Sequence, residues 1–400
     1  MALTNSAARY GAVSKSFHWI TALLIFALIP LGIIANGLPF ETSDELALKA
    51  LWFSVHKTLG VTVFFVALAR ILWAIIEPKP AGLHPERRLE TFAAETVHWL
   101  LYGSLLLVPL SGWVHHAATT GFAPIWWPFG QNLPFVPKNE DLASAAAGLH
   151  IVFERVLVLS LFLHIAGALK HHFLDRDATL KRMLPGRTEA AAPDPKRHQL
   201  LLPVAGAIAL WGGALVMGGA LGLYERHGTT VEAAELSDVE SAWQVQEGTL
   251  AITVVQMGSD VEGQFADWTA AIDFDVSVES GKAGSVDVAI SIGSLTLGSV
   301  TDQAMGTDFF NADAFPTATF VADILRTEAG YEAQGTVSIK EHSMPVTLPF
   351  ELTVTDGVAQ MSGSTSLDRR NYGIGDNQSD AASLGFDVVV NVALTANLAE

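Results

Sequence analysis

The sequence predicts a multidomain protein: an all-α transmembrane helical bundle followed by an all-β antiparallel barrel. Long apolar runs occupy residues 1–230, whereas residues 231–400 alternate short apolar and polar stretches. Charge divides at the same place. The first part carries 18 Lys+Arg and 15 Asp+Glu, and the second part carries 5 and 26. The net charge of −18 therefore belongs mainly to the C-terminal part.

Five segments are long and apolar enough to cross a hydrocarbon core about 30 Å thick, which needs roughly 20 helical residues. A cleaved signal peptide is a poor interpretation of the first segment, because four more spans follow. We expect membrane spans at residues 17–36, 55–76, 96–116, from near 144 to 173, and at 200–223.

The loops between these spans predict their orientation. Basic residues gather before span one, between spans two and three, and between spans four and five, whereas loops 41–49 and 117–143 are acidic or nearly uncharged. The positive-inside rule then places the N-terminus in the cytoplasm. After five crossings the acidic part lies outside. We therefore expect a multi-pass protein of the bacterial inner membrane with a periplasmic C-terminal domain.

Composition excludes several classes of function. The acidic surface disfavours nucleic acid and anionic lipid headgroups, although solubility alone would also explain it. The chain has no cysteine, which excludes disulfides, covalently attached c-type haem and cysteine-ligated iron–sulfur clusters. Any metal or haem must therefore be held by histidine, methionine or carboxylates.

The C-terminal part reads as a series of short strands from Trp243 onward. Glycine, aspartate and asparagine interrupt a period-two pattern, which is typical of an antiparallel barrel or sandwich. The expected strand segments are residues 249–256, 270–280, 285–295, 318–325, 331–340, 344–355, 358–367 and 385–398.

Four histidines in the apolar spans carry the main functional signal, because an ionisable side chain at bilayer depth is costly. His150 and His164 are 14 residues apart in span four. At about 100° and 1.5 Å per residue, they lie on nearly the same helix face, roughly 21 Å apart along the axis. His18 lies at the depth of His164, and His56 lies at the depth of His150.

Two facing imidazole pairs in a helical bundle are what two b-type haems require, with His18, His56, His150 and His164 as axial ligands. Two axial imidazoles leave no open position on the iron, which favours electron transfer. Interhelical hydrogen bonding and a proton relay remain alternatives. Zinc at these pairs is disfavoured, because the pairs are far apart and no carboxylate or thiol completes a tetrahedron.

Other polar residues in and near the spans have two interpretations. They form ordinary interfacial hydrogen bonds, or they contact a haem propionate, a quinone or a lipid phosphate. These residues are His98, His115, His116, His171, His172, Arg70 and Arg155.

The N-terminal part resembles the bacterial cytochrome b561 family across about residues 8–187. The resemblance is carried by SKSFHWI, SVHKTLG, ETVHWLLY, LHIVFERV and LHIAGALKHHFLDRDATLKRMLPG. It implies a four-helix di-haem membrane core, the same four histidine ligands, and electron exchange with ubiquinone. At least one member is understood as a superoxide oxidase.

The C-terminal part resembles the YceI-like family across about residues 236–398, through WQVQEGTLAITV, VEGQFADWTAAIDFD, TDFFNADAFPTATF, VSIKEHSMPVTLPFELTV and LDRRNYGIGD. The resemblance implies a lipocalin-like barrel whose apolar interior holds an isoprenoid such as a polyprenyl quinone. The alternative is that the aromatic side chains simply fill the core. The interior candidates are Phe265, Trp268, Phe274, Phe309, Phe310, Phe315 and Phe320.

Together these patterns predict a four-helix di-haem domain (1–190), a fifth membrane helix (198–224), a linker (225–240) and the periplasmic barrel (241–400). The expected function is electron transfer across the bilayer to or from ubiquinone, with superoxide:ubiquinone oxidoreduction as one form of it. The alternatives are a carrier between quinol and a periplasmic protein, and a non-redox, membrane-anchored isoprenoid-binding protein. Expected partners are membrane lipid and ubiquinone or another polyisoprenoid, without nucleic acid. No catalytic residue is assigned.

Overall fold

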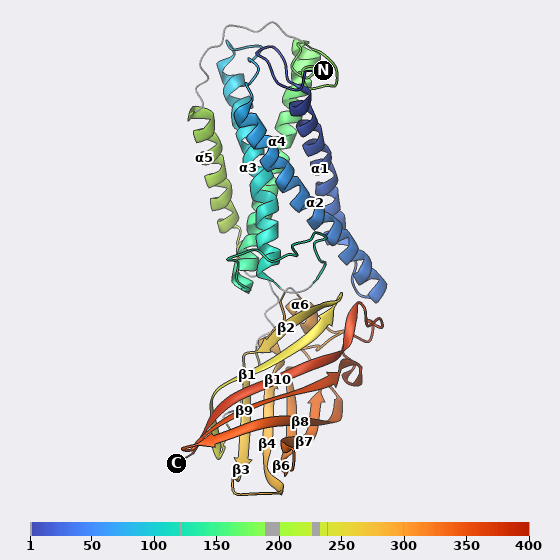
Figure 1. Cartoon of the computed structure of the whole chain (residues 1–400), viewed down its shortest axis with the longest axis vertical. Helices are drawn as coiled ribbons and strands as arrows, with labels where there is room; N and C mark the ends of the chain where they lie inside the picture. The colour runs from blue at the N-terminus through green and yellow to red at the C-terminus, as the bar shows by residue number, and fades with distance from the viewer. Residues whose placement is uncertain are drawn as a thin grey trace. The chain divides into compact units, whose positions relative to one another are not determined.

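The computed structural model describes residues 2–119, 122–188, 201–225, 233–237, 239–298 and 300–399. The chain divides into two compact units. The helical unit comprises residues 1–37, 51–118 and 124–226, and the sheet unit comprises residues 38–50, 119–123 and 227–400. In Figure 1 the helices run from blue to green and the strands from yellow to red.

Within the described residues, five helices are long and apolar enough to span a membrane, which confirms the predicted helical part. Residues from four of them, Ile25, Val63, Leu105 and Leu157, meet in one buried cluster. The helices are α1 (Ala12–Gly37), α2 (Ser43–Ile76), α3 (Arg88–Ala118), α4 (Glu140–Lys170), which continues into a short π-helix (His171–Asp175), and α5 (Leu201–Ala220).

Several helices begin earlier than hydropathy predicts. Helix α2 begins at Ser43, so the acidic segment that we expected to be a loop is largely helical. Thr42 and Glu45 form a capping box: the Thr42 hydroxyl accepts from the Glu45 amide at 3.3 Å, and the Glu45 carboxylate accepts from the Thr42 amide at 3.1 Å. Likewise, the Asn139 side chain caps α4 by accepting from the Leu142 amide. Hydropathy detects only the apolar portion, whereas these polar caps determine where the helices begin.

The described part of the sheet unit forms one antiparallel sheet in the order β3-β4-β6-β7-β8-β9-β10-β1-β2-β5, which curls into a half-barrel (Figure 1). A short helix, α6 (Thr301–Met305), precedes β6. The strands are β1 (Trp243–Gln256), β2 (Ser259–Phe265), β3 (Trp268–Phe274), β4 (Gly281–Ser291), β5 (Leu295–Thr296), β6 (Thr317–Thr327), β7 (Gly330–Ile339), β8 (His342–Thr355), β9 (Val358–Asp368) and β10 (Leu384–Leu398).

Two strand predictions need correction. The sequence reading missed β2, which pairs with β1 across a tight turn at Met257 and Gly258, both with positive φ. It also extended β3 to residue 280, whereas the strand ends at Phe274. The Asp275 side chain accepts from the amide and hydroxyl of Ser277, and this local turn competes successfully with strand extension.

One end of the half-barrel is organised by a buried arginine. Arg369, 3% exposed, follows β9 and donates to the backbone carbonyls of Ile374 and Gly375 at 2.8 and 2.6 Å. It also donates to the carbonyls of Gln378, Leu384 and Gly385. A single guanidinium thus satisfies five carbonyls of the segment that joins β9 to β10. These hydrogen bonds come from a charged donor and are stronger than those of a neutral side chain, and no neutral side chain offers as many donors.

We expect Arg369→Met to destabilise this end of the sheet by about 3 kcal/mol, because the buried carbonyls lose their charged donor. Hydrogen exchange of the β9–β10 peptides in the full-length protein measures the loss. Arg370→Met is the matched control: Arg370 is exposed and pairs with Asp368, so its removal costs less than about 1 kcal/mol. Equal effects of both substitutions would contradict the role assigned to Arg369.

Candidate functional site

The helical unit brings the four predicted histidines together as two pairs. His18 on α1 lies beside His164 on α4, with ring centroids 6.1 Å apart. His56 on α2 lies beside His150 on α4, with centroids 6.5 Å apart. These are the partners that the depth argument predicts. Helix α4 therefore contributes one imidazole to each pair.

The spacing within each pair matches that of two imidazoles on opposite sides of one metal ion. Each metal–nitrogen bond is about 2.0 Å, and the ring centre lies about 1.1 Å beyond the nitrogen, which places the two centroids about 6 Å apart. Ring packing without a metal is the alternative, and the backbone contacts of the rings bear on it.

Both rings of the His56–His150 pair are held by backbone carbonyls. His56 Nδ1 lies 3.1 Å from the Leu28 carbonyl, and His150 Nδ1 lies 2.8 Å from the Val108 carbonyl. A ring whose Nδ1–H donates to a carbonyl keeps Nε2 as its electron-pair donor, which is the usual outer-shell arrangement of a metal-binding histidine.

The helices that supply these carbonyls contain prolines. Pro30 lies inside α1 and Pro109 lies inside α3. A proline has no N–H, and its ring distorts the preceding turn of a helix. Leu28 and Val108 lie in those turns, two residues before Pro30 and one residue before Pro109, and the Val108 carbonyl also accepts from the Ser111 hydroxyl at 2.9 Å.

Two glycines make room for the same pair. A Cβ atom added to Gly32 on α1 would lie 3.0 Å from the His56 ring, and one added to Gly112 on α3 would lie 3.0 Å from the His150 ring. Such distances are tighter than ordinary van der Waals contact. The absence of side chains at both positions therefore lets the rings lie against the helix backbones.

The His18–His164 pair has aromatic and cationic neighbours. Trp19 contacts His18 edge-on, with centroids 5.4 Å apart, and His98 contacts His164 edge-on at 5.2 Å. The Arg70 guanidinium lies 5.5 Å from the Tyr102 ring centre and is close enough to interact electrostatically with both imidazoles of the pair. Arg70 therefore lies at a histidine pair, as the propionate interpretation requires.

The other predicted polar residues have contacts within the protein. His115 Nδ1 lies 2.9 Å from the Ala143 carbonyl, and the His115 ring packs edge-on against His116. Arg155 is largely exposed and pairs with Glu154 at 3.3 Å. The His172 ring packs edge-on against Phe173. For His115 and Arg155, the structure shows contacts with backbone and carboxylate oxygens.

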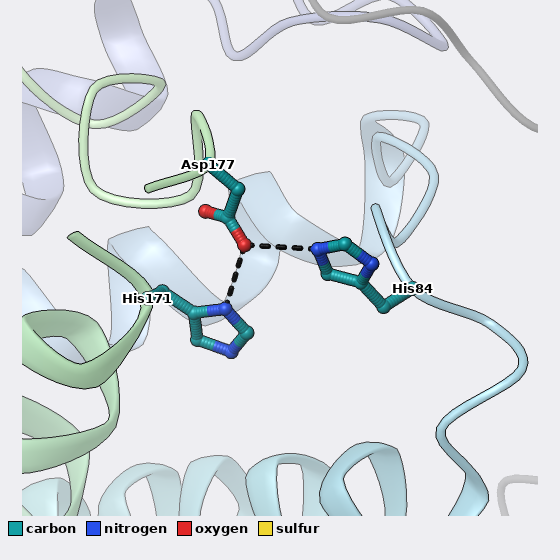
Figure 2. A group of neighbouring side chains, drawn as sticks. All are labelled: His84, His171 and Asp177. Atoms are coloured by element: carbon teal, nitrogen blue, oxygen red, sulfur yellow. Dashed lines mark hydrogen bonds and ion pairs between the residues drawn. The ribbon is translucent and has the colours of Figure 1, made fainter. Parts of the chain in front are cut away.

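A third group of polar side chains lies where α4 ends (Figure 2). His84 Nε2 and His171 Nδ1 point at one oxygen of Asp177, at 3.0 and 2.7 Å. Burial raises the pKa of Asp177, but hydrogen bonds from Thr179, His171 and His84 outweigh it and lower the pKa to about 2. The sequence analysis considered His171 but missed His84 and Asp177. Their signal was a histidine in the α2–α3 loop and an aspartate six residues beyond His171.

The sheet unit forms a partly open apolar cavity of about 290 Å³. Six of the seven predicted interior aromatics line it: Phe265, Trp268, Phe274, Phe309, Phe310 and Phe320. Phe315 is not among the described residues that line the cavity. It lies in the turn before β6, where its amide donates to the Asn311 carbonyl. The sequence reading also missed the aliphatic lining, including Val288, Leu348 and Val390.

The family model for prokaryotic cytochrome b561 matches residues 9–186, the range that contains both histidine pairs. Cytochrome b561 homolog 2 of Escherichia coli (strain K12) is 31% identical over 192 residues, which cover 46% of this chain and 95% of that protein. The chain belongs to the prokaryotic cytochrome b561 family. Cytochrome b561 homolog 1 of the same organism is 25% identical over 181 residues, which cover 45% of this chain and 98% of the relative.

Another relative is the "Probable superoxide oxidase CybB" of Yersinia pestis, 23% identical over 178 residues, which cover 44% of this chain and 96% of that protein. Membership in the cytochrome b561 family makes this chain a membrane electron-transfer protein and implies haem b as its cofactor. The donor atoms fit that group, because the family's range contains two imidazole pairs at metal-bridging spacing.

The model for the YceI-like domain matches residues 242–396. Among solved structures, Burkholderia cenocepacia BcnA is 27% identical, with a TM-score of 0.35, and covers 38% of this chain and 96% of that one. A Campylobacter jejuni YceI protein is 20% identical, with a TM-score of 0.31, and covers 44% and 94%. This cytochrome b561 chain therefore carries a YceI-like, lipocalin-like domain of the kind associated with isoprenoids.

Proposed function

We propose that the helical unit is a di-haem b-type cytochrome that moves electrons across the bacterial inner membrane to or from ubiquinone. His18 with His164 and His56 with His150 are the axial ligands. The observation that supports the proposal is the distance between ring centroids, 6.1 Å in the first pair and 6.5 Å in the second, with α4 contributing one histidine to each pair. When bound, the two haems supply one-electron carriers near the two membrane surfaces.

Apolar side chains exclude water from the space between the two histidine pairs and hold the helices in place there. Leu157 lies midway between His150 and His164 on α4, on the same face, and is 6% exposed. It packs with Val63, Ala67 and Leu105 in the buried cluster of the bundle. The two pairs are thus held about 21 Å apart along one helix, which spans most of a hydrocarbon core about 30 Å thick.

We expect two b-type haems per chain, with each pair holding one. His56→Ala and His164→Ala should each lose about one haem, because a remaining axial imidazole holds the porphyrin weakly. Gly112→Val should selectively disturb the His150 pair. Pyridine haemochrome quantitation and the dithionite-reduced spectrum measure the change.

Gly60→Val is the matched control, because a Cβ atom added to Gly60 in α2 meets no described atom within 4 Å. The control should keep the wild-type haem content. One haem in the wild-type protein, or full retention in both histidine variants, would refute the ligand assignment.

The finer form of the proposal is superoxide:ubiquinone oxidoreduction. Two superoxide anions are oxidised to two O₂, while one quinone takes up two electrons and two protons. The similarity to the Yersinia pestis protein supports it. Lys57 follows His56 in the chain and is close enough to interact with it electrostatically, so in its protonated form it would attract an anionic substrate to this pair. The loop charges favour a periplasmic position for this end of the bundle and for the sheet unit.

Purified protein with ubiquinone should consume superoxide faster than spontaneous dismutation in a stopped-flow assay. Lys57→Met should lower the second-order rate constant by about tenfold, because electrostatic steering is lost. Lys138→Met, outside the bundle, should leave it unchanged. A wild-type rate equal to dismutation would reject superoxide as the donor and favour electron exchange with a periplasmic protein.

We propose that the sheet unit binds an isoprenoid, such as a polyprenyl quinone, in its cavity. The support is a partly open space of about 290 Å³ with an almost entirely apolar lining, which suits a slim hydrocarbon chain. Valine occurs on both faces of the sheet in the neighbouring strands β4 and β6. Val288 on β4 lines the cavity, and Val321 on β6 is 53% exposed.

Organic extraction and mass spectrometry of the full-length protein should recover an isoprenoid. Val288→Trp should reduce the amount several-fold by filling the cavity, whereas Val321→Trp should retain it. Absence of isoprenoid from the wild-type extract, or equal recovery from both variants, would argue against the cavity as its site.

A further inference from the structure

The cluster at the end of α4 has the composition of a metal site. His84, His171 and Asp177 each offer one ligand atom, and these atoms all lie within 4.8 Å of one another. Figure 2 shows the two imidazoles approaching the same carboxylate oxygen from different segments. We propose that these three residues bind one divalent transition-metal ion, such as Zn²⁺, at a site separate from the two haem pairs.

The donor set fits the chemistry of zinc. Two imidazole nitrogens and one carboxylate oxygen are three protein ligands that Zn²⁺ accepts, with a fourth position left for water. Bonds of about 2 Å in tetrahedral geometry separate ligand atoms by about 3.3 Å. The two imidazole nitrogens now lie 3.0 and 2.7 Å from the Asp177 oxygen and within 4.8 Å of each other, so side-chain adjustments of well under 2 Å bring the three atoms to this geometry.

Neighbouring groups already orient the ligands as an outer shell does. His84 Nδ1 lies 3.3 Å from the Glu86 carboxylate, and this contact directs Nε2 toward Asp177. The second Asp177 oxygen accepts from the Thr179 amide at 2.7 Å. The side chains of His84, His171 and Asp177 are 29%, 23% and 11% exposed, so an ion from solution can reach them.

Charge distinguishes this group from its neighbour. Glu90, His171 and Asp175 also come within ligand distance of one another. Protein cations neutralise that second group, because Lys170 contacts both Glu90 and Asp175, and Arg87 lies 3.0 Å from Asp175. The contacts of Asp177 are instead two imidazoles and the amide and hydroxyl of Thr179, none of them a Lys or Arg side chain, so its negative charge is available to a metal ion.

The backbone is shaped to bring these residues together. The last turn of α4 widens into a π-helix at His171, a feature often found at functional sites. Arg176 then adopts φ of 55°, and the Asp177 amide returns to donate to the His171 carbonyl at 3.1 Å. His84 comes from the α2–α3 loop. A bound ion would therefore cross-link that loop to the end of α4, two helical turns beyond His164.

The alternative is a hydrogen-bonded cluster that never binds metal, and zinc titration separates the two. Full-length protein without a histidine tag, stripped with chelator, is titrated with ZnCl₂ by calorimetry, and bound zinc is counted by elemental mass spectrometry. We expect one zinc per chain. His84→Gln and Asp177→Asn should each weaken binding at least about tenfold. His172→Gln, next to the cluster, should bind like wild type.

Hydrogen exchange of the wild-type protein gives a second readout that needs no variant. Zinc should slow exchange in peptides that cover residues 82–88 and 171–179 and leave the sheet unit unchanged. Failure of the wild-type protein to bind zinc overturns the proposal. So does binding that His84→Gln and Asp177→Asn leave unaltered, provided that both variants keep their haem spectrum. Haem content is measured separately, so loss of zinc and loss of haem are distinguishable.

Discussion

The helical unit depends on one constraint, the placement of polar imidazoles inside an apolar bundle. An unpartnered imidazole at bilayer depth is costly, so each must meet a partner at its own depth. Helix α4 meets this constraint twice, at His150 and His164, with the buried Leu157 between them. A shift of α4 by one residue would turn both imidazoles about 100° away from their partners at once. The two pairs therefore fix the register of α4 against α1 and α2.

The local features around the His56–His150 pair follow from the same constraint. The carbonyls of Leu28 and Val108, each in the helical turn before a proline, lie within hydrogen-bond distance of the Nδ1 atoms of the two rings. Glycine at positions 32 and 112 brings the helix backbones against the rings. Glycine weakens a helix, so the glycines at these positions of α1 and α3 are explained by the space that they leave for the two rings rather than by helix stability. These features favour a metal-binding role for the two rings, because packing of one ring against the other requires neither the carbonyl partners nor the glycines.

Sequence periodicity predicted whatever depends on a single helix or strand. It found the five spans and the four paired histidines, because depth and helix face follow from spacing alone. It did not find the contact between His84 and Asp177, which are 93 residues apart and come from a loop and a helix end. It missed the helical segment from Ser43, because capping rather than hydropathy begins α2. It placed Phe315 in the interior, but Phe315 is not among the described residues that line the cavity.

One class of molecule, the polyprenyl quinones, connects the roles proposed for the two units. A polyprenyl quinone has a redox-active head and a long apolar tail. Under the proposed function, haem held by the histidine pairs would exchange electrons with such a head, and the apolar cavity of the sheet unit would hold such a tail. The acidic surface of the C-terminal part does not attract nucleic acid, and no cysteine is present to provide thiol redox chemistry. We therefore propose a quinone as the one ligand common to both units. Each unit's role is testable without the other, because the paired histidines and the residues that line the cavity do not overlap.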